Sequence, residues 1–127
     1  MRISLISFLA AGLLIGSSVT FAADTLRPEV GTPLQEAQAA LKAKNYREAL
    51  ADVDAAEKVG SLTAYESYIV NRMRAAAATG AGQSSVAIKA YETALASPQM
   101  PAAEKLQTYD VIAKLAYGAR NYSKAAE

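Results

Sequence analysis

The chain contains no cysteine, no histidine and no tryptophan among its 127 residues. Without cysteine it forms no disulfide and offers no thiolate to a metal or a substrate. Without histidine it lacks the side chain that most often acts as a base near neutral pH and most often binds metals. Catalysis would have to rely on carboxylates or on serine with lysine. The sequence therefore predicts a protein that is not an enzyme and that has no cofactor and no metal site.

The carboxylates that could replace histidine do not form a convincing catalytic group. Asp54 and Glu57 share one helix face at a spacing of three, whereas Asp52 points elsewhere. The glycine pair at Gly80 and Gly82 is not preceded by the strand that a dinucleotide-binding fingerprint requires. The carboxylates are more simply interpreted as a solvated helix face, and the glycines as part of a loop.

Strand patterns are missing as well. No run alternates valine, isoleucine or threonine with polar residues, and no Asn-Gly or Asp-Gly pair marks a hairpin turn. Alanine, which has the best helix propensity, is the most common residue. We therefore expect an all-α fold.

The N-terminal segment 1–22 differs from the rest of the chain. Arg2 is followed by a largely apolar stretch from Ile3 to Ile15, and Thr20-Phe21-Ala22 places small residues before a cut at Ala23. A retained membrane anchor is the alternative, but the stretch is shorter than the roughly 20 residues that span a bilayer. We expect a signal peptide at 1–22, a periplasmic or secreted protein, and no stable membrane insertion after cleavage.

Charge is balanced once the leader is removed. The chain has 13 basic and 12 acidic residues, and loss of Arg2 leaves 12 of each. A surface that binds nucleic acid carries clustered lysine and arginine, whereas here the charges are interspersed. We expect no nucleic-acid partner.

Capping residues mark where helices begin and end. Thr32-Pro33 with Gln35 predicts a first helix start, which leaves residues 23–31 as a flexible segment before a domain at 32–127. The later boundaries are read from caps, glycines and prolines. They predict starts at Asn45, Thr63, Ser84 or Ser85, Pro101 and Asn121, and ends at Gly60, Gly80, Pro98 and Gly118.

A short pattern occurs twice, as residues 45–49 (Asn-Tyr-Arg-Glu-Ala) and 121–125 (Asn-Tyr-Ser-Lys-Ala). The separation of the copies is 76 (121 − 45), or two periods of 34 with eight left over, which predicts a third, less regular copy between them. The chain resembles the tetratricopeptide repeat family, whose 34-residue unit is a pair of antiparallel helices. The resemblance implies an insertion between Ala75 and Ser84 in the middle copy. The positions that match its small and large residues are Ala37, Tyr46, Ala49, Val53, Ala56, Ala87, Tyr91, Ala94, Tyr109, Ala113, Tyr122 and Ala125.

The resemblance implies a right-handed solenoid of about three hairpins, the last incomplete because the chain stops early in its second helix. It also implies a groove along the first helix of each hairpin that binds a protein or peptide. The groove positions are Leu34, Gln38, Leu41, Glu66, Val70, Met73, Arg74, Asp110, Lys114 and Tyr117. Tyr46 is expected to pack within its hairpin and against the next one.

Two functional hypotheses follow. The first is an exported scaffold that mediates protein–protein interaction in the cell envelope. The second is the N-terminal helical domain of a larger secreted enzyme whose catalytic part lies beyond Glu127. Further hairpins in a longer reading frame would favour the scaffold, and a segment with new histidine or cysteine chemistry would favour the enzyme.

Overall fold

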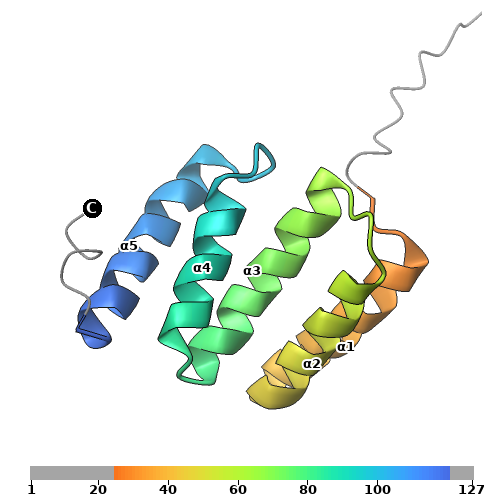
Figure 1. Cartoon of the computed structure of the whole chain (residues 1–127), viewed down its shortest axis with the longest axis horizontal. Coiled ribbons are helices and arrows are strands. Elements are labelled where there is room, and N and C mark those ends of the chain that lie inside the picture. The colour runs from red at the N-terminus through yellow and green to blue at the C-terminus, as the bar shows by residue number, and fades with distance from the viewer. Residues whose placement is uncertain (1–24, 121–127) are drawn as a thin grey trace, which may run out of the picture.

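A computed structural model describes residues 25–120, and this part of the chain is entirely helical, with no strand (Figure 1). The all-α prediction is therefore confirmed. The helices are α1 (Pro28–Lys42), α2 (Tyr46–Lys58), α3 (Ala64–Gly80), α4 (Ser84–Leu95) and α5 (Ala102–Gly118). None of these helices is long and apolar enough to cross a bilayer. The predicted leader, the sixth helix, Tyr122 and Ala125 lie outside the described residues.

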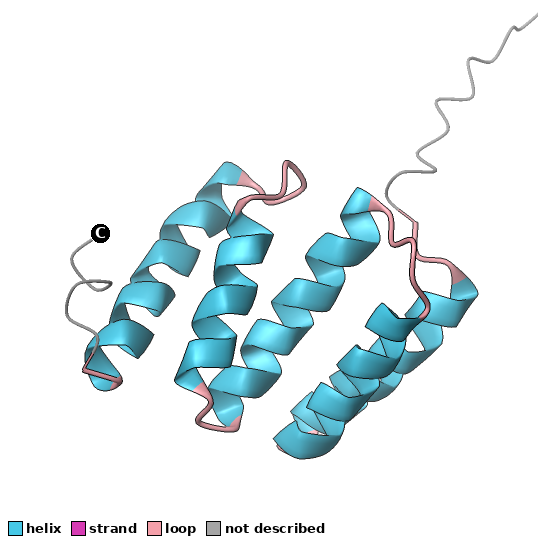
Figure 2. Ribbon diagram, viewed as in Figure 1, coloured by secondary structure: helices cyan, strands magenta, loops and turns pink. Residues whose placement is uncertain are grey.

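Each helix packs against its neighbours in the chain. α1 lies against α2 and α3 against α4, while α3 also contacts α1 and α2, and α5 contacts α4. The connections after α1 and α3 lie at one end of the molecule, and those after α2 and α4 lie at the other (Figure 2). Consecutive helices therefore run antiparallel.

The turn that follows each odd-numbered helix has the same geometry. Lys44, Gly82 and Arg120 have φ values of +58°, +73° and +60°. The spacing between these positions is 38 in both cases (82 − 44 and 120 − 82). In the first two turns the next amide closes the helix end: Asn45 donates to the carbonyl of Ala40, and Gln83 to that of Ala78.

The period of the chain is thus 38, and the expected period of 34 with an insertion is wrong. The stretch from Ala75 continues α3 without interruption to Gly80. The ends of α1, α3 and α5 at Lys42, Gly80 and Gly118 keep the same spacing of 38 (80 − 42 and 118 − 80).

Alanine occupies the same buried positions in each copy. It allows helix backbones to approach closely because its side chain is a single methyl group. The equivalent buried alanines are Ala37 and Ala75, Ala40, Ala78 and Ala116, Ala49 and Ala87, and Ala56 and Ala94. Val53 is buried with them, whereas Tyr91 and Ala113 are half-buried and Tyr109 is 59% exposed.

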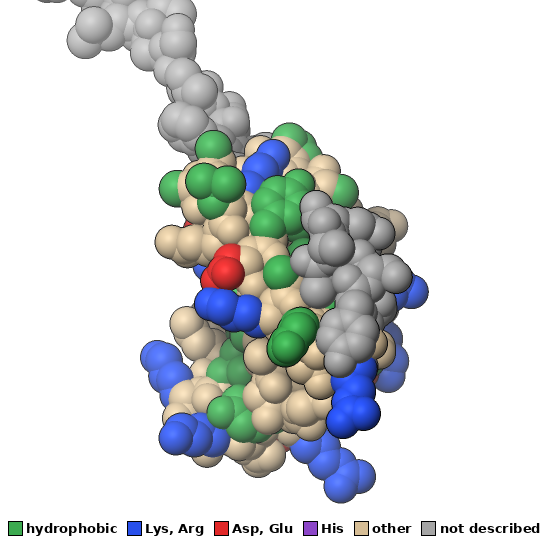
Figure 3. All heavy atoms as spheres, turned by 90° about the vertical axis from the view of Figure 1, so that its left-hand side faces the viewer, with side chains coloured by type: hydrophobic (Ala, Val, Ile, Leu, Met, Phe, Trp, Pro, Cys, Tyr) green, Lys and Arg blue, Asp and Glu red, His purple; other side chains and the backbone are tan. Residues whose placement is uncertain are grey.

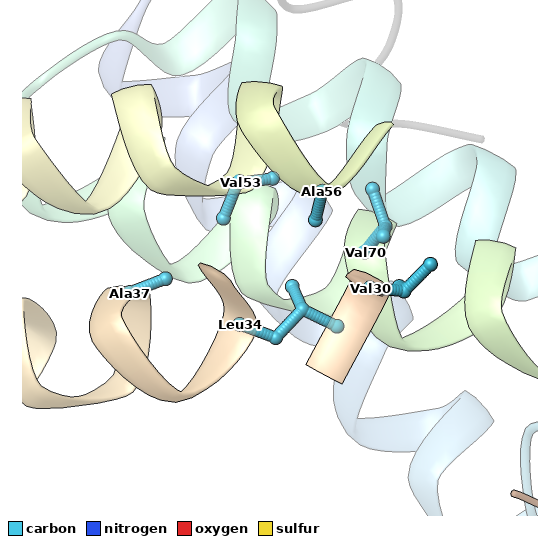
Figure 4. Close-up of a cluster of buried hydrophobic side chains, with 6 residues drawn as sticks. All are labelled: Val30, Leu34, Ala37, Val53, Ala56 and Val70. Carbon is cyan, nitrogen blue, oxygen red and sulfur yellow. The ribbon is translucent and has the colours of Figure 1, made fainter. Parts of the chain in front are cut away.

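The first core cluster lies where α1, α2 and α3 meet. Val30, Leu34 and Ala37 of α1 face Val53 and Ala56 of α2 and Val70 of α3 (Figure 4). Partly buried hydrophobic side chains close the cluster at its edge, namely Leu26, Leu62, Ile69 and Met73.

The first helix begins at Pro28, five positions before Pro33, which was predicted as the first helical residue after a cap at Thr32. Pro28 takes the first helical position, where its missing N–H costs nothing, and Pro33 lies inside the helix. Val30 and Leu26 pack into the first core, and this burial favours the longer helix. Residues 28–31, which were expected to belong to a flexible segment, are therefore helical.

The later helix boundaries lie close to the predicted positions. Thr63 and Glu66 form the predicted capping box, and Gly60 ends α2 with a φ of +78°. Asn45 lies at the N-cap, but its side-chain amide donates to Glu48 rather than accepting from the helix. α4 begins at Ser84, so Gln83 occupies the cap position predicted for a serine.

Tyr46 is half-buried, and its ring lies directly over Gly80 at the end of α3. A Cβ atom at position 80 would overlap the ring, whereas a Cβ at the equivalent Gly118 meets nothing. The predicted contact of Tyr46 with the next hairpin is therefore present, and it requires glycine at position 80.

Gly80→Ala should destabilise the protein by about 1 to 2 kcal/mol, because the new methyl group displaces the tyrosine ring. In a Tyr46→Ala background, which itself should cost about 2 kcal/mol, the same change should stabilise by up to about 1 kcal/mol through helix propensity. Urea unfolding of the two single variants and the double variant measures this reversal of sign. Gly118→Ala is the matched control and should not destabilise; equal effects at positions 80 and 118 would show that the ring contact is unimportant.

Candidate functional site

A cleft of about 290 Å³ lies between α3, α4 and α5. We call it the α3–α5 cleft. Two lining residues come from α3, one from α4, four from α5, and one from the connection before α5. They are Arg72, Ala76, Tyr91, Glu104, Gln107, Thr108, Val111 and Met100.

The cleft occupies the place that hydrophobic core occupies in the preceding copy of the repeat. Subtracting 38 from each lining position gives eight positions around the first core cluster, which are Leu34, Gln38, Val53, Leu62, Glu66, Ile69, Val70 and Met73. Leu34, Val53 and Val70 belong to that cluster, and Leu62, Ile69 and Met73 pack against it. Equivalent positions of the repeat therefore form both interfaces.

Three apolar residues of the first interface are replaced by polar ones in the second. Arg72 stands at the position of Leu34, Gln107 at that of Ile69, and Thr108 at that of Val70. Val111, Met100 and Tyr91 replace Met73, Leu62 and Val53, and keep part of the lining apolar. A cleft with mixed polar and apolar lining results where a closed core could have formed.

A small polar network lies along one side of the cleft. The hydroxyl of Tyr68 donates to Glu104 Oε2 at 2.9 Å, and Arg72 Nη2 lies 3.6 Å from the same oxygen. The guanidinium carbon of Arg72 is 5.7 Å from the centre of the Tyr68 ring, within cation–π range. Burial, together with the bond to Glu104, raises the pKa of Tyr68, so the phenol remains a donor at neutral pH.

Thr108 is a buried residue of the cleft lining. Its hydroxyl donates to the carbonyl oxygen of Glu104 at 2.8 Å and lies 3.8 Å from the sulfur of Met100. These contacts satisfy the buried hydroxyl, and leave Arg72 and Glu104 as the charged groups of the lining.

The cleft lining combines charged, polar and apolar side chains. It contains one carboxylate and one guanidinium, and no nucleophile paired with a base. Between residues 25 and 120, no three acidic side chains converge where a metal ion could sit. Arginine and tyrosine are the residue types that most often contribute strongly to protein interfaces.

The structure does not bring the ten predicted groove residues together. Leu34, Glu66 and Val70 have at most 3% of their surface exposed, so the prediction that they face a partner is wrong. Leu41 and Met73 are half-buried against core clusters, and Gln38 is exposed on α1. None of the ten lines the α3–α5 cleft.

Arg74 is engaged in the structure instead. Its Nη2 atom lies 3.0 Å from Asp54 Oδ1 and 2.7 Å from Glu57 Oε2, so it links α3 to α2. The hydrogen bond from Arg74 lowers the pKa of Glu57. Arg74 also borders a second hollow, of about 460 Å³, between α2, α3 and α4.

The three predicted residues of α5 are exposed. Figure 3 views the molecule from the side on which α5 lies, and hydrophobic and charged side chains are both present on this face. Lys114 Nζ pairs with Asp110 Oδ2 one turn away at 2.6 Å, and Tyr117 is 68% exposed. An exposed pair of this kind contributes little to stability. Leu106 and Tyr109 are also exposed on α5, so apolar surface accompanies the charges here.

The prediction missed the cleft because it aligned α3 with α1 two positions away from the true spacing of 38. Leu34 and Asp110 are equivalent under the period of 38, and their partner in α3 is Arg72, whereas the prediction chose Val70. A shift of two positions corresponds to about 200° around a helix, which moves a side chain from one face to the opposite one. The separation of 76 between the two motif copies already permitted two equal periods of 38.

Comparison with protein-family models, with curated proteins and with solved structures finds no match for this chain.

Proposed function

We propose that this protein is an exported helical-repeat scaffold, similar to tetratricopeptide repeat proteins, that binds a protein or peptide partner in the cell envelope. In this proposal the hairpins stack as a right-handed solenoid with a period of 38. The unit resembles the tetratricopeptide one in its helix pair and its buried alanines, and its first copy has Tyr46 at the start of the second helix. It is longer by one helical turn.

The single observation that supports binding best is the α3–α5 cleft. Where the first interface buries Leu34, the second presents Arg72, whose side chain is 48% exposed. Polar residues at core positions cost stability, and natural proteins accept such costs at functional sites. A purely structural repeat would gain by filling both interfaces alike.

Export is supported by the leader pattern of residues 1–22. The absence of histidine and cysteine from the sequence supports a scaffold over an enzyme. The mixed cleft lining supports a polypeptide ligand, because peptide segments present amides and apolar side chains together.

A photo-cross-linking amino acid placed at Gln107, on the rim of the cleft, should attach a protein partner in living cells. Mass spectrometry of the periplasmic or secreted fraction should identify the adduct, and the N-terminus of the recovered chain should lie near Ala23. The same amino acid at the exposed Ala51 of α2 serves as the control and should give no adduct. Retention of Met1 in cytoplasmic protein, or identical products from both positions, would contradict the proposal.

A further inference from the structure

The two charged groups of the α3–α5 cleft have unused hydrogen-bonding capacity. A guanidinium has five N–H donors, and a carboxylate has about four acceptor positions. Within residues 25–120, the contacts found for Arg72 are an ion pair at 3.6 Å and the face of Tyr68. The side chain of Glu104 accepts one hydrogen bond there, from the Tyr68 hydroxyl.

The equivalent carboxylate in the first interface is fully used. Glu66 accepts from the main chain and from the side chain of Arg27, and also from the amide of Thr63. The position of Thr63 is taken in the next copy by Pro101, which has no amide hydrogen to donate. Glu104 thus lacks the donors that hold Glu66, and it faces a cleft instead of a closed interface.

The charge of the ligand follows from the closeness of the two groups. An anion placed on Arg72 would lie close to Glu104, and a cation placed on Glu104 would lie close to Arg72, so either would meet a like charge. A neutral amide avoids both repulsions. Its carbonyl accepts from a guanidinium, while its N–H donates to a carboxylate.

We propose that the α3–α5 cleft binds a neutral peptide segment of the partner, with Arg72 donating to an amide carbonyl and Glu104 accepting from an amide N–H. This inference rests on the proposed function and names its contact point. Met100, Val111 and Ala76 line the same cleft and would contact an apolar side chain of the segment. Gln107, at the exposed rim, supplies a further amide.

Three small probes built on leucine test the charge requirement. They are N-acetyl-leucinamide, which is neutral, N-acetyl-leucine, which is an anion, and leucinamide, which is a cation. The NMR titrations use the protein as it is purified from cells. The neutral probe should shift the backbone resonances of Ala76, Gln107 and Val111. It should bind at least about tenfold more tightly than either charged probe, which is the ratio expected for a difference of about 1.4 kcal/mol.

Arg72→Leu should reduce the shifts from the neutral probe at least fivefold, whereas Arg47→Leu on the exposed side of α2 should leave them unchanged. A cooperative melting curve with a midpoint no lower than that of the wild type shows that the Arg72→Leu protein is folded. Stronger binding of either charged probe, or shifts that survive Arg72→Leu, would overturn the inference.

The same variant separates this inference from the proposed function. If Arg72→Leu abolishes the in-cell adduct at Gln107 and Arg47→Leu does not, both stand. If the adduct survives Arg72→Leu, the scaffold proposal stands and the cleft chemistry is wrong. If the protein that carries only the cross-linker at position 107 forms no adduct in cells, but the neutral probe binds the wild-type protein, the cleft chemistry stands and the protein-binding proposal fails.

Discussion

Replacing Arg72 with leucine, Gln107 with isoleucine and Thr108 with valine should raise the stability of the protein and abolish binding at the α3–α5 cleft. These are the residue types that the first interface has at the equivalent positions 34, 69 and 70. Each apolar side chain that becomes fully buried contributes about 1.5 to 3 kcal/mol. Part of this is offset because Arg72 leaves Tyr68 and Thr108 loses its two hydroxyl contacts.

We expect a net gain of about 2 kcal/mol, which for a domain of this size is roughly 8 to 16 °C in the melting temperature. Thermal unfolding followed by circular dichroism measures the gain, and cross-linking at position 111 in place of 107 measures the loss of binding. A stability gain paired with loss of binding is the trade-off expected where polar residues are kept for function.

The reciprocal substitution at the first interface is the control. Leu34→Arg places a charge at a position that is 3% exposed in the structure and should cost about 4 kcal/mol. If the triple variant were no more stable than the wild type while Leu34→Arg was tolerated, the two interfaces would not share one plan, and the polar lining would have no functional meaning.

The fold class and the later helix boundaries could be predicted from the sequence because they depend on local signals. Thr63 with Glu66, Gly60 and Pro101 act through neighbouring residues, and the structure has helix ends at all of them. The start of α1 could not be predicted in this way. Thr32-Pro33 is a good local start, but burial of Val30 against residues of two other helices favours an earlier one.

The candidate site depended on the repeat period, which local signals do not determine. A period of 34 was taken from the resemblance to a known family, whereas the turns at Lys44, Gly82 and Arg120 give 38. The prediction matched Leu34 with Val70, two positions short of the spacing of 38, and so left Arg72 unnoticed. The contact of Glu66 with Arg27 was missed for a different reason, since Arg27 lies in a distant part of the chain, before α1.

Arg27→Met should be among the most destabilising substitutions outside the hydrophobic clusters. Arg27 Nε and Nη2 lie 2.9 and 2.8 Å from the carboxylate oxygens of Glu66, and Nη2 also donates to the carbonyls of Gly60 and Ser61. Glu66 is completely buried. Leaving this carboxylate without its partner should cost about 3 kcal/mol, because a buried charge would remain uncompensated. Urea unfolding at pH 7 measures the loss.

The matched variants separate the charge from the packing. Arg27→Lys keeps the charge but not the forked geometry and should be intermediate. The double variant Arg27→Met/Glu66→Met removes both charges and should recover most of the loss, since an apolar pair leaves no buried carboxylate. A double variant as unstable as Arg27→Met alone would show that the arginine acts through packing rather than through Glu66.

The effect of pH gives an independent test of the same contact. The hydrogen bonds from Arg27 lower the pKa of Glu66 from 4.5 to about 2 in the folded protein. A carboxyl group whose pKa is lower in the folded state stabilises the fold above its ordinary pKa, and this stabilisation is lost as the pH falls from about 4.5 towards 2.

In Arg27→Met the buried carboxyl would instead be protonated in this range, which removes the cost of burying its charge. The difference in unfolding free energy between wild type and Arg27→Met should therefore be largest at pH 7 and should shrink steadily below about pH 4.5. Parallel pH profiles for the two proteins would mean that Glu66 does not depend on Arg27 for its ionised state, and the contact would have to be regarded as incidental to the fold.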